Sequence, residues 1–160
     1  LCGPGDLDTA RRRVSVFRAL ASRYGLDRAE VVSGDFSEGG GAEAARDALT
    51  RWPEVTALFA DTVTQAIGIL GLAYESGIRV PDELTVVAQA DSPLAAFLAP
   101  ALTAVQMPLA ELGAAGVDAL IEQVESGTMR DVTIETEPRL VPRSSTAQPR
   151  TGRLDPFRLR

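Results

Sequence analysis

The stretch that decides the fold is residues 74–113, YESGIRVPDELTVVAQADSPLAAFLAPALTAVQMPLAELG. It begins at the end of a helix, which Gly77 can close because glycine adopts the left-handed conformation at little cost. Pro81 follows where a helix cannot continue. Residues 84–88 form a nearly continuous apolar run, which is typical of a strand covered on both faces. A loop, a second strand and a helix after Pro108 complete an alternation that predicts a parallel sheet.

The same alternation of strands and helices continues on both sides of this stretch. We predict helices over about 9–24, 38–51, 63–76 and 109–126, with a short helical turn near 93–98. We predict strands over 29–33, 55–60, 84–89, 102–106, 132–136 and 139–141. The predicted fold class is therefore α/β with a doubly wound parallel sheet. Residues 1–146 are expected to form the domain, and the Arg- and Pro-containing end from Ala147 is expected to be a disordered tail.

The composition excludes several kinds of chemistry. The chain has no His and no Lys, and its sixteen cationic side chains are all Arg. Ser-His and Cys-His nucleophile pairs, Schiff-base lysines and the phosphate-loop lysine are therefore unavailable. Cys2 is the single cysteine, so neither an internal disulfide nor a Cys/His zinc site can form, and we expect it to be a small buried hydrophobe. We predict a protein that is not an enzyme and that carries no metal or cofactor.

Length, charge and hydropathy limit the partners. A chain of 160 residues can bury one core. The net charge of −6 argues against DNA binding by this segment alone, since such binding needs a cationic surface. No apolar run is long enough to span a membrane, and the opening residues lack the order of a signal peptide. We expect a cytoplasmic protein without membrane contacts. Because the chain opens without Met, we also expect upstream sequence to be missing.

The wording of residues 74–113 resembles the effector-binding core of LacI/GalR-type transcriptional repressors. In that family a helix ending in "GIRVP" leads to a strand like "DLSVVGFDD", a strand like "PPLTTV" and a helix like "PLEELG". The resemblance extends from about Gly3 to Thr146. It implies a periplasmic-binding-protein-like fold, of which this chain holds mainly the C-terminal lobe. It further implies a small-molecule effector, a homodimer, and DNA binding only through a helix-turn-helix that this chain does not contain.

Candidate ligand groups follow the predicted strands. In a doubly wound sheet, ligands bind beyond the carboxyl ends of the parallel strands. The loops there, with the first turns of the helix after residue 8, offer carboxylates, hydroxyls, an aromatic ring and a guanidinium: Asp6, Arg13, Asp35, Phe36, Asp61, Thr62, Gln89, Asp91 and Ser92. Such groups suit a polyol or a nucleobase, since carboxylates accept hydroxyl hydrogen bonds, a ring stacks, and Arg supplies a fork of donors.

The resemblance assigns roles to two of these residues. Arg13 falls on the family's effector-contacting Arg when TARRRVSVF is laid on "aRxRxxGF". The alternative is a solvated Arg on a helix face, and three consecutive arginines leave the register open by one position. Phe36 matches the aromatic residue after "GD" that stacks on the effector in the family, and the alternative is a ring at the edge of the core. Asp35 is predicted to be a loop or capping residue.

Two departures from the family pattern concern the ligand groups. The family's "NDxxAxG" becomes TVTQAIG, which places Thr62 and Val63 at the Asn and Asp, with Asp61 one residue earlier. Asp61 and Thr62 are either ligand groups or helix caps. The family's "GFDD" becomes AQAD, so Ala90 replaces the first Asp, and Asp91 either touches a ligand or caps the following turn. We infer an effector less hydroxylated than a sugar, or a pocket that no longer responds to a common ligand.

These residues suggest three functions. The first is a ligand-sensing and dimerisation module of a LacI/GalR-like regulator. The second is a small-molecule binding protein of the same fold that serves transport. The third is an enzyme or phosphoacceptor on a flavodoxin-like sheet with Asp61 as the reactive carboxylate, which the absence of Lys disfavours because a receiver domain pairs that Asp with a Lys. The family wording favours regulation.

Overall fold

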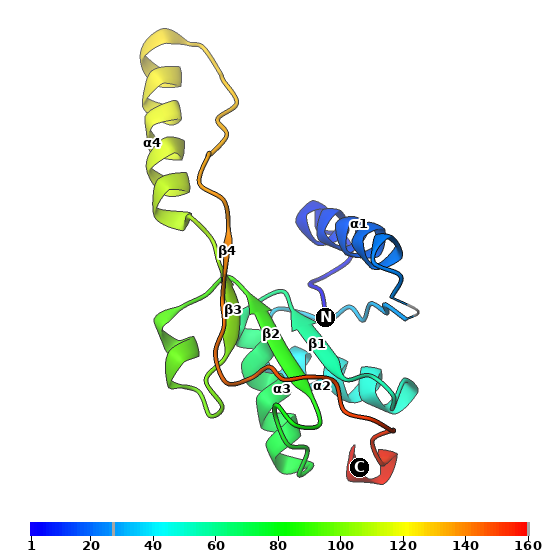
Figure 1. The fold of residues 1–160 in the computed structure, drawn as a ribbon. Helices are drawn as coiled ribbons and strands as arrows, with labels where there is room; N and C mark the ends of the chain where they lie inside the picture. The colour runs from blue at the N-terminus through cyan, green and yellow to red at the C-terminus, as the bar shows by residue number, and fades with distance from the viewer. Residues whose placement is uncertain (27, 160) are drawn as a thin grey trace.

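A four-stranded sheet organises the chain, with the strand order β1-β2-β3-β4 (Figure 1). The computed structural model describes residues 1–26 and 28–159, without the side chains of Pro156 and Phe157. Strands β1, β2 and β3 are parallel and β4 is antiparallel to β3; their bounds are Ala57–Ala60, Thr85–Gln89, Thr103–Gln106 and Arg139–Val141. The predicted α/β class is confirmed, and the sheet is mixed because the chain returns beside β3 in the opposite direction.

Two helices cover one face of the sheet. In β1 and β2 buried residues alternate with less buried ones, as the period of two in a strand requires. The buried side packs on α2 (Glu38–Arg51) and α3 (Val63–Glu75), which lie side by side behind the sheet in Figure 1. Gly68 allows the two helices to touch, because a Cβ there would lie 1.8 Å from the carbonyl oxygen of Glu38. Such close contact anchors the loops that precede both helices.

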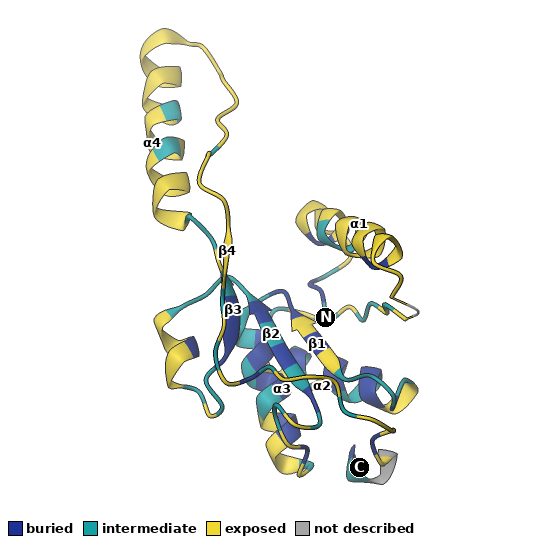
Figure 2. Ribbon diagram, viewed as in Figure 1, coloured by how far each residue is buried: buried dark blue, intermediate teal, exposed yellow. Residues whose placement is uncertain are grey.

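Helix α1 (Asp8–Arg23) is packed far more loosely than α2 and α3. Only Ala10 and Ala21 of this helix are buried. Phe17 remains 37% exposed, although it belongs to the apolar side of the helix. Figure 2 shows α1 as mostly exposed and set to one side of the sheet. The helix therefore lacks an apolar surface that would complete its packing.

Helix α4 (Leu109–Ser126) forms an arm together with the segment that follows it. No residue of α4 is buried, and the helix extends away from the sheet in Figures 1 and 2. Its sequence is apolar on several faces, which predicts burial on more than one side. The returning segment contacts α4 through the Arg130–Glu122 ion pair and the hydrogen bond from Thr136 to Glu111, but it buries no residue of the helix. The arm leaves the sheet after β3 and returns at β4.

Two predicted strands are not formed. Residues 29–33 contribute only one isolated parallel bridge, between Cys2 and Ser33. The backbone of Cys2 is hydrogen-bonded to Val32 and Gly34, at the carboxyl end of this stretch. Residues 132–136 have no strand because they run beside α4, away from the sheet. The last predicted strand, β4, is confirmed at Arg139–Val141.

The segment after Ala147 differs from the predicted disordered tail. The described residues 147–159 pack on the body and end in the short helical turn η2 (Pro156–Leu159). Leu154 and Leu159 are buried in the core, each 4% exposed. Arg150 donates hydrogen bonds to the carbonyl oxygens of Pro53, Val55 and Glu83. The segment is ordered because two apolar anchors are buried and one guanidinium satisfies several carbonyls, which outweighs its polar and Pro-containing composition.

Candidate functional site

Three of the predicted ligand residues meet around Gly3, at the carboxyl end of the sheet. Asp61 directly follows β1, and Arg13 comes from the second turn of α1. Arg13 Nη1 lies 3.4 Å from Asp61 Oδ2, and the Gly3 amide donates to the same oxygen at 3.3 Å. The Asp61 side chain is 3% exposed and that of Arg13 is 39% exposed. The pair thus combines a buried acceptor with a donor that solvent or a ligand can reach.

The ring of Phe36 lies over Gly3. A Cβ at position 3 would lie 2.1 Å from Cζ of Phe36, so only glycine leaves room for this ring. Phe36 itself is half-buried. Its ring therefore lies beside the Arg13–Asp61 pair, with the backbone of Gly3 between them. This position is compatible with a ring that stacks on a ligand and with a ring at the edge of the core.

Asp35 and Ser37 form the turn that presents Phe36. Asp35 Oδ1 accepts hydrogen bonds from the amide, at 2.8 Å, and from the hydroxyl of Ser37. These bonds hold the pKa of Asp35 below its usual value. Ser37 in turn caps α2 by accepting from the Gly40 amide at 3.0 Å. Asp35 is therefore a loop residue, as predicted.

Thr62 acts as the N-cap of α3. Its Oγ1 accepts from the Gln65 amide at 3.0 Å, which is the capping role that was one of its two predicted readings. Gln65 was missed by the sequence analysis. It is fully buried, and its Nε2 donates to the Asp35 carbonyl oxygen at 2.8 Å, so it ties α3 to the Phe36 loop. The available signal was an amide side chain on the apolar side of this helix.

Asp91 is held by Arg143. The carboxylate oxygens accept from Arg143 Nη1 at 2.8 Å and Nη2 at 2.9 Å. This bidentate pair holds the pKa of Asp91 below its usual value, mainly through the hydrogen bonds from Arg143. Capping of the next turn was one of the two roles predicted for Asp91, and η1 (Pro93–Phe97) has no side-chain cap at its N-cap residue, Ser92. Arg143, 52 residues further on, left no local signal in the sequence.

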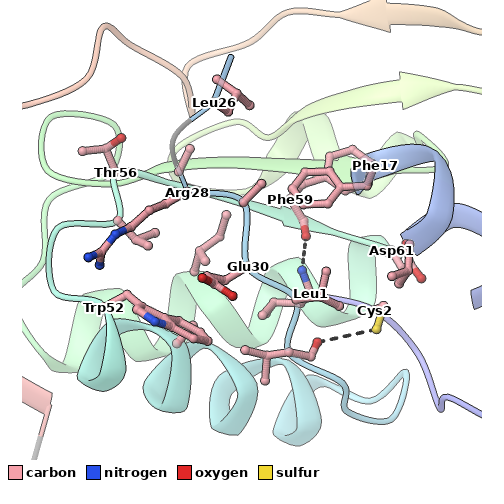
Figure 3. A pocket seen from close by; sticks show the side chains of 18 of the residues that line it. Leu1, Cys2, Phe17, Leu26, Arg28, Glu30, Trp52, Thr56, Phe59 and Asp61 are labelled. Atoms are coloured by element: carbon pink, nitrogen blue, oxygen red, sulfur yellow. Dashed lines mark hydrogen bonds between the residues drawn. The ribbon is translucent and has the colours of Figure 1, made fainter. Parts of the chain in front are cut away.

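An apolar cavity of about 420 Å³ adjoins the Arg13–Asp61 pair. It runs from Asp61 and Leu1 at one end to Trp52 and Arg28 at the other (Figure 3). Its walls come from α1, from the free edge of β1 and from residues 28–32. The predicted ligand residues therefore border only one end of a long, apolar space.

Comparison with known proteins places this arrangement in a family. The sequence pattern of the periplasmic binding protein-like domain matches residues 1–146. The chain belongs to this family. The resemblance of residues 74–113 to LacI-family regulators is likewise confirmed by the relatives that match. The C-terminal segment from Ala147 lies beyond the matched region.

The periplasmic binding protein-like chain is similar to curated transcriptional repressors and regulators. It is 32% identical over 147 residues to the ribose operon repressor of Escherichia coli K12, which covers 91% of this chain and 44% of that protein. It is 31% identical over 147 residues to the transcriptional regulator CelR of Thermobifida fusca, covering 91% of this chain and 43% of CelR. The chain thus spans less than half the length of these curated relatives.

Solved structures of LacI-family regulators share the fold. A regulator from Mycobacterium smegmatis matches with a TM-score of 0.84 and 30% identity, covering 93% of this chain and 56% of that one. The structure of CelR in complex with cellobiose matches with a TM-score of 0.82 and 30% identity, covering 91% of this chain and 45% of that one.

Among the described residues, none of the helices has the length and apolar character that crossing a membrane requires.

Proposed function

We propose that this chain is the ligand-sensing part of a LacI-like, DNA-binding transcriptional regulator in the cytoplasm and that it has no catalytic role. Its effector is a small molecule, sugar-like or related. The observation that carries the proposal is the Arg13–Asp61 pair beside the Phe36 ring at the carboxyl end of the sheet. The relatives named for ribose and the complex with cellobiose support a sugar-like ligand class.

Each of the three residues has a chemical role in the proposed site. The Asp61 carboxylate accepts a hydrogen bond from a ligand hydroxyl, and the guanidinium of Arg13 donates to a ligand oxygen. The ring of Phe36 packs on the apolar face of the ligand. Thr62, next to Asp61, adds a hydroxyl at the same edge, and Asp91 contributes from the neighbouring strand end when its bond to Arg143 opens.

The signal reaches DNA through parts of the protein beyond this chain. The α4 arm leaves the sheet after β3 and returns to it at β4, which supports a second lobe carried there. Effector bound between two lobes favours their closed arrangement, which changes how a homodimer presents its two DNA-reading heads. This coupling is a population shift whose size is set by the difference in ligand affinity between the two states.

Ligand titrations on the 160-residue chain and its variants test the proposed site. Ribose and cellobiose are titrated while melting temperature and amide NMR shifts are followed. Arg13→Ala and Phe36→Ala should each weaken binding about tenfold, the equivalent of ~1.4 kcal/mol, because a donor or a stacking surface is lost.

Two matched controls separate the site from general effects. Arg12→Ala removes a neighbouring guanidinium whose side chain is 81% exposed and pairs with Asp8. Phe97→Ala removes a ring that is 85% exposed and lies in η1. Both controls should bind like the parent chain. Equal losses in controls and site variants, or binding that survives both site variants, would reject the site.

A further inference from the structure

Gln65 is the largest fully buried polar side chain among the described residues. It lies in the first turn of α3, where its backbone amide donates to Thr62 Oγ1 at 3.0 Å. Burying a side-chain amide costs free energy unless its donors and acceptors are paired. An apolar side chain of the same length would fill this place without that cost, so the partners of the amide decide what Gln65 does.

The amide nitrogen of Gln65 binds two loops of the proposed effector site. Nε2 donates to Asp35 O at 2.8 Å and lies 3.5 Å from Cys2 O, at the outer limit of a hydrogen bond. The first carbonyl directly precedes Phe36, and the second directly precedes Gly3. Because both partners are acceptors, only the nitrogen end of the amide fits against them, which fixes its orientation.

One buried side chain thus joins the segments that carry the proposed ligand groups. The Gly3 amide donates to Asp61 Oδ2 at 3.3 Å, and the Phe36 ring lies over Gly3. Asp61 directly precedes the N-cap of α3, so it belongs to the same turn as Gln65. The spacing between the ring and the carboxylate, which a ligand would have to match, therefore depends on loops that are fastened to a single amide.

The backbone of Gln65 is itself held by α2. A Cβ on Gly41 would lie 2.3 Å from Gln65 O and 2.7 Å from its Cα, so the first turns of the two helices touch at this residue. Close packing of this kind leaves little freedom of movement. The amide therefore extends from a rigid point of the fold to two loops that have fewer contacts of their own.

The oxygen of the same amide indicates a role in positioning and not in stability. Gln65 Oε1 is buried and has no hydrogen-bond partner among the described residues. An unpaired buried acceptor costs about as much free energy as a hydrogen bond contributes. The bond to Asp35 O and the unpaired oxygen therefore offset each other. Residues that serve a site at no gain in stability are a common result of the conflict between stability and function.

We propose that Gln65 is a positioning residue of the effector site. It sets the spacing between the Phe36 ring and the Asp61 carboxylate, because it anchors the two loops on which that spacing depends. Its effect on ligand affinity rests on the proposed function, whereas its effect on the loops requires no ligand. Without the amide, the ligand groups remain but lose their common anchor, so affinity falls while the fold is kept.

The test replaces the amide by an apolar side chain in the 160-residue chain. Gln65→Met keeps the length and nearly the volume of the side chain but removes both the donor and the unpaired oxygen. Gln65→Leu repeats the test with a second apolar side chain, and Gln123→Met is the same exchange at an exposed position of α4. Urea denaturation gives the stability, and amide hydrogen exchange followed by NMR gives the local opening of the loops.

The expected result separates the loops from the rest of the fold. The Gly34 amide donates to Cys2 O and the Ser37 amide to Asp35 Oδ1, so these two amides report on the anchored loops. Both should exchange at least about fivefold faster in the two Gln65 variants, the equivalent of one ordinary hydrogen bond. Exchange at the Thr85 amide, which is bonded within the sheet, and the urea midpoint should stay the same or show greater stability.

Titrations with ribose and cellobiose distinguish this inference from the proposed function. A sugar that binds the parent chain should bind both Gln65 variants at least about fivefold more weakly and Gln123→Met equally well. If neither sugar binds the parent chain, the proposed ligand class fails, and the exchange rates alone decide the role of Gln65. Unchanged exchange at Gly34 and Ser37 would overturn the inference. A general loss of protection and stability, or full affinity in a variant with loosened loops, would overturn it as well.

Discussion

At the scale of single residues, Ala90 has an unfavourable backbone conformation. Its φ is 63°, in the left-handed region, and it is the one non-glycine residue with positive φ among those described. A left-handed conformation costs a residue with a Cβ on the order of 1–2 kcal/mol. Ala90 lies between β2 and the Asp91–Arg143 pair, so the strain is located where the chain turns away from the sheet.

We predict that Ala90→Gly stabilises the chain by roughly 0.5–1 kcal/mol. Glycine removes the steric cost, and its larger entropy in the unfolded chain offsets part of the gain. The control is Ala57→Gly, at an exposed strand position with ordinary backbone, which should destabilise by a similar amount. Urea denaturation of both variants measures the difference. Destabilisation by Ala90→Gly would show that its methyl group makes contacts that outweigh the strain.

The Asp91–Arg143 pair gives a second prediction at this scale. The side chains are 11% and 17% exposed, and Arg143 also donates to Leu102 O at 2.6 Å. Loss of one partner leaves the other charge poorly solvated, so Asp91→Asn and Arg143→Gln should each cost about 2–4 kcal/mol. The double variant should cost less than the sum of the two. A double-mutant cycle by denaturation measures this coupling, and strict additivity would contradict it.

At the scale of elements, the C-terminal segment 147–159 fastens the loop between α3 and β2. Arg158 Nη1 donates to Glu83 Oε1 at 2.9 Å, and its other nitrogens donate to the carbonyls of Ser76 and Gly77 at the end of α3. The Arg79 amide donates to Glu83 Oε2 at 3.0 Å. Glu83 thus joins two segments that are distant in the sequence, while Leu154 and Leu159 bury the apolar part of the contact.

This joint predicts a defined pH dependence of stability. The hydrogen bonds from Arg158 lower the pKa of Glu83 from its ordinary 4.5 to about 2. A carboxyl group whose pKa is lowered by folding stabilises the folded state at any pH above its pKa in the unfolded chain. For Glu83 this stabilisation is lost as the pH falls from about 4.5 toward 2. Glu83→Gln should therefore cost roughly 1.5–3 kcal/mol at pH 7, the range for hydrogen bonds to charged groups, and much less near pH 2.5.

A matched substitution isolates the effect of Glu83. Asp82 is its neighbour, but its side chain is 69% exposed and pairs with Arg79 at 3.6 Å. Asp82→Asn should change the free energy of unfolding by less than about 1 kcal/mol at any pH. The comparison is made by urea denaturation at pH 7, 4 and 2.5. A pH-independent cost of Glu83→Gln would mean that shape, and not charge, matters at this position.

At the scale of the whole molecule, the α4 arm is the largest exposed apolar element. Val117, Leu120 and Val124 are all more than half exposed. We predict concentration-dependent self-association, because exposed apolar patches find partners. The double substitution Val117→Glu and Leu120→Glu should raise the concentration of half-association at least about tenfold, whereas Leu94→Glu, an exposed apolar position in η1, should not. Light scattering over a wide concentration range measures the self-association. A monomer at every concentration would contradict the prediction.

Local patterns in the sequence determined most of the elements. Pro108, the Ser37 and Thr62 caps and the apolar runs in 55–60 and 84–89 identify helices and strands because capping and burial on both faces act within a few residues. They also brought Arg13, Phe36 and Asp61 to one edge of the sheet, since the carboxyl ends of parallel strands meet there. Cys2 is buried as predicted.

Only the tertiary structure decided which groups pair across the chain. Asp91 binds Arg143, Gln65 holds the Phe36 loop, and the C-terminal segment buries Leu154 and Leu159. These contacts join residues far apart in the sequence, so no local sequence pattern predicts them. The strand expected at 29–33 depends on a neighbour in the same way. A strand's pattern fixes its side-chain faces, but its hydrogen bonds exist only where another backbone lies beside it.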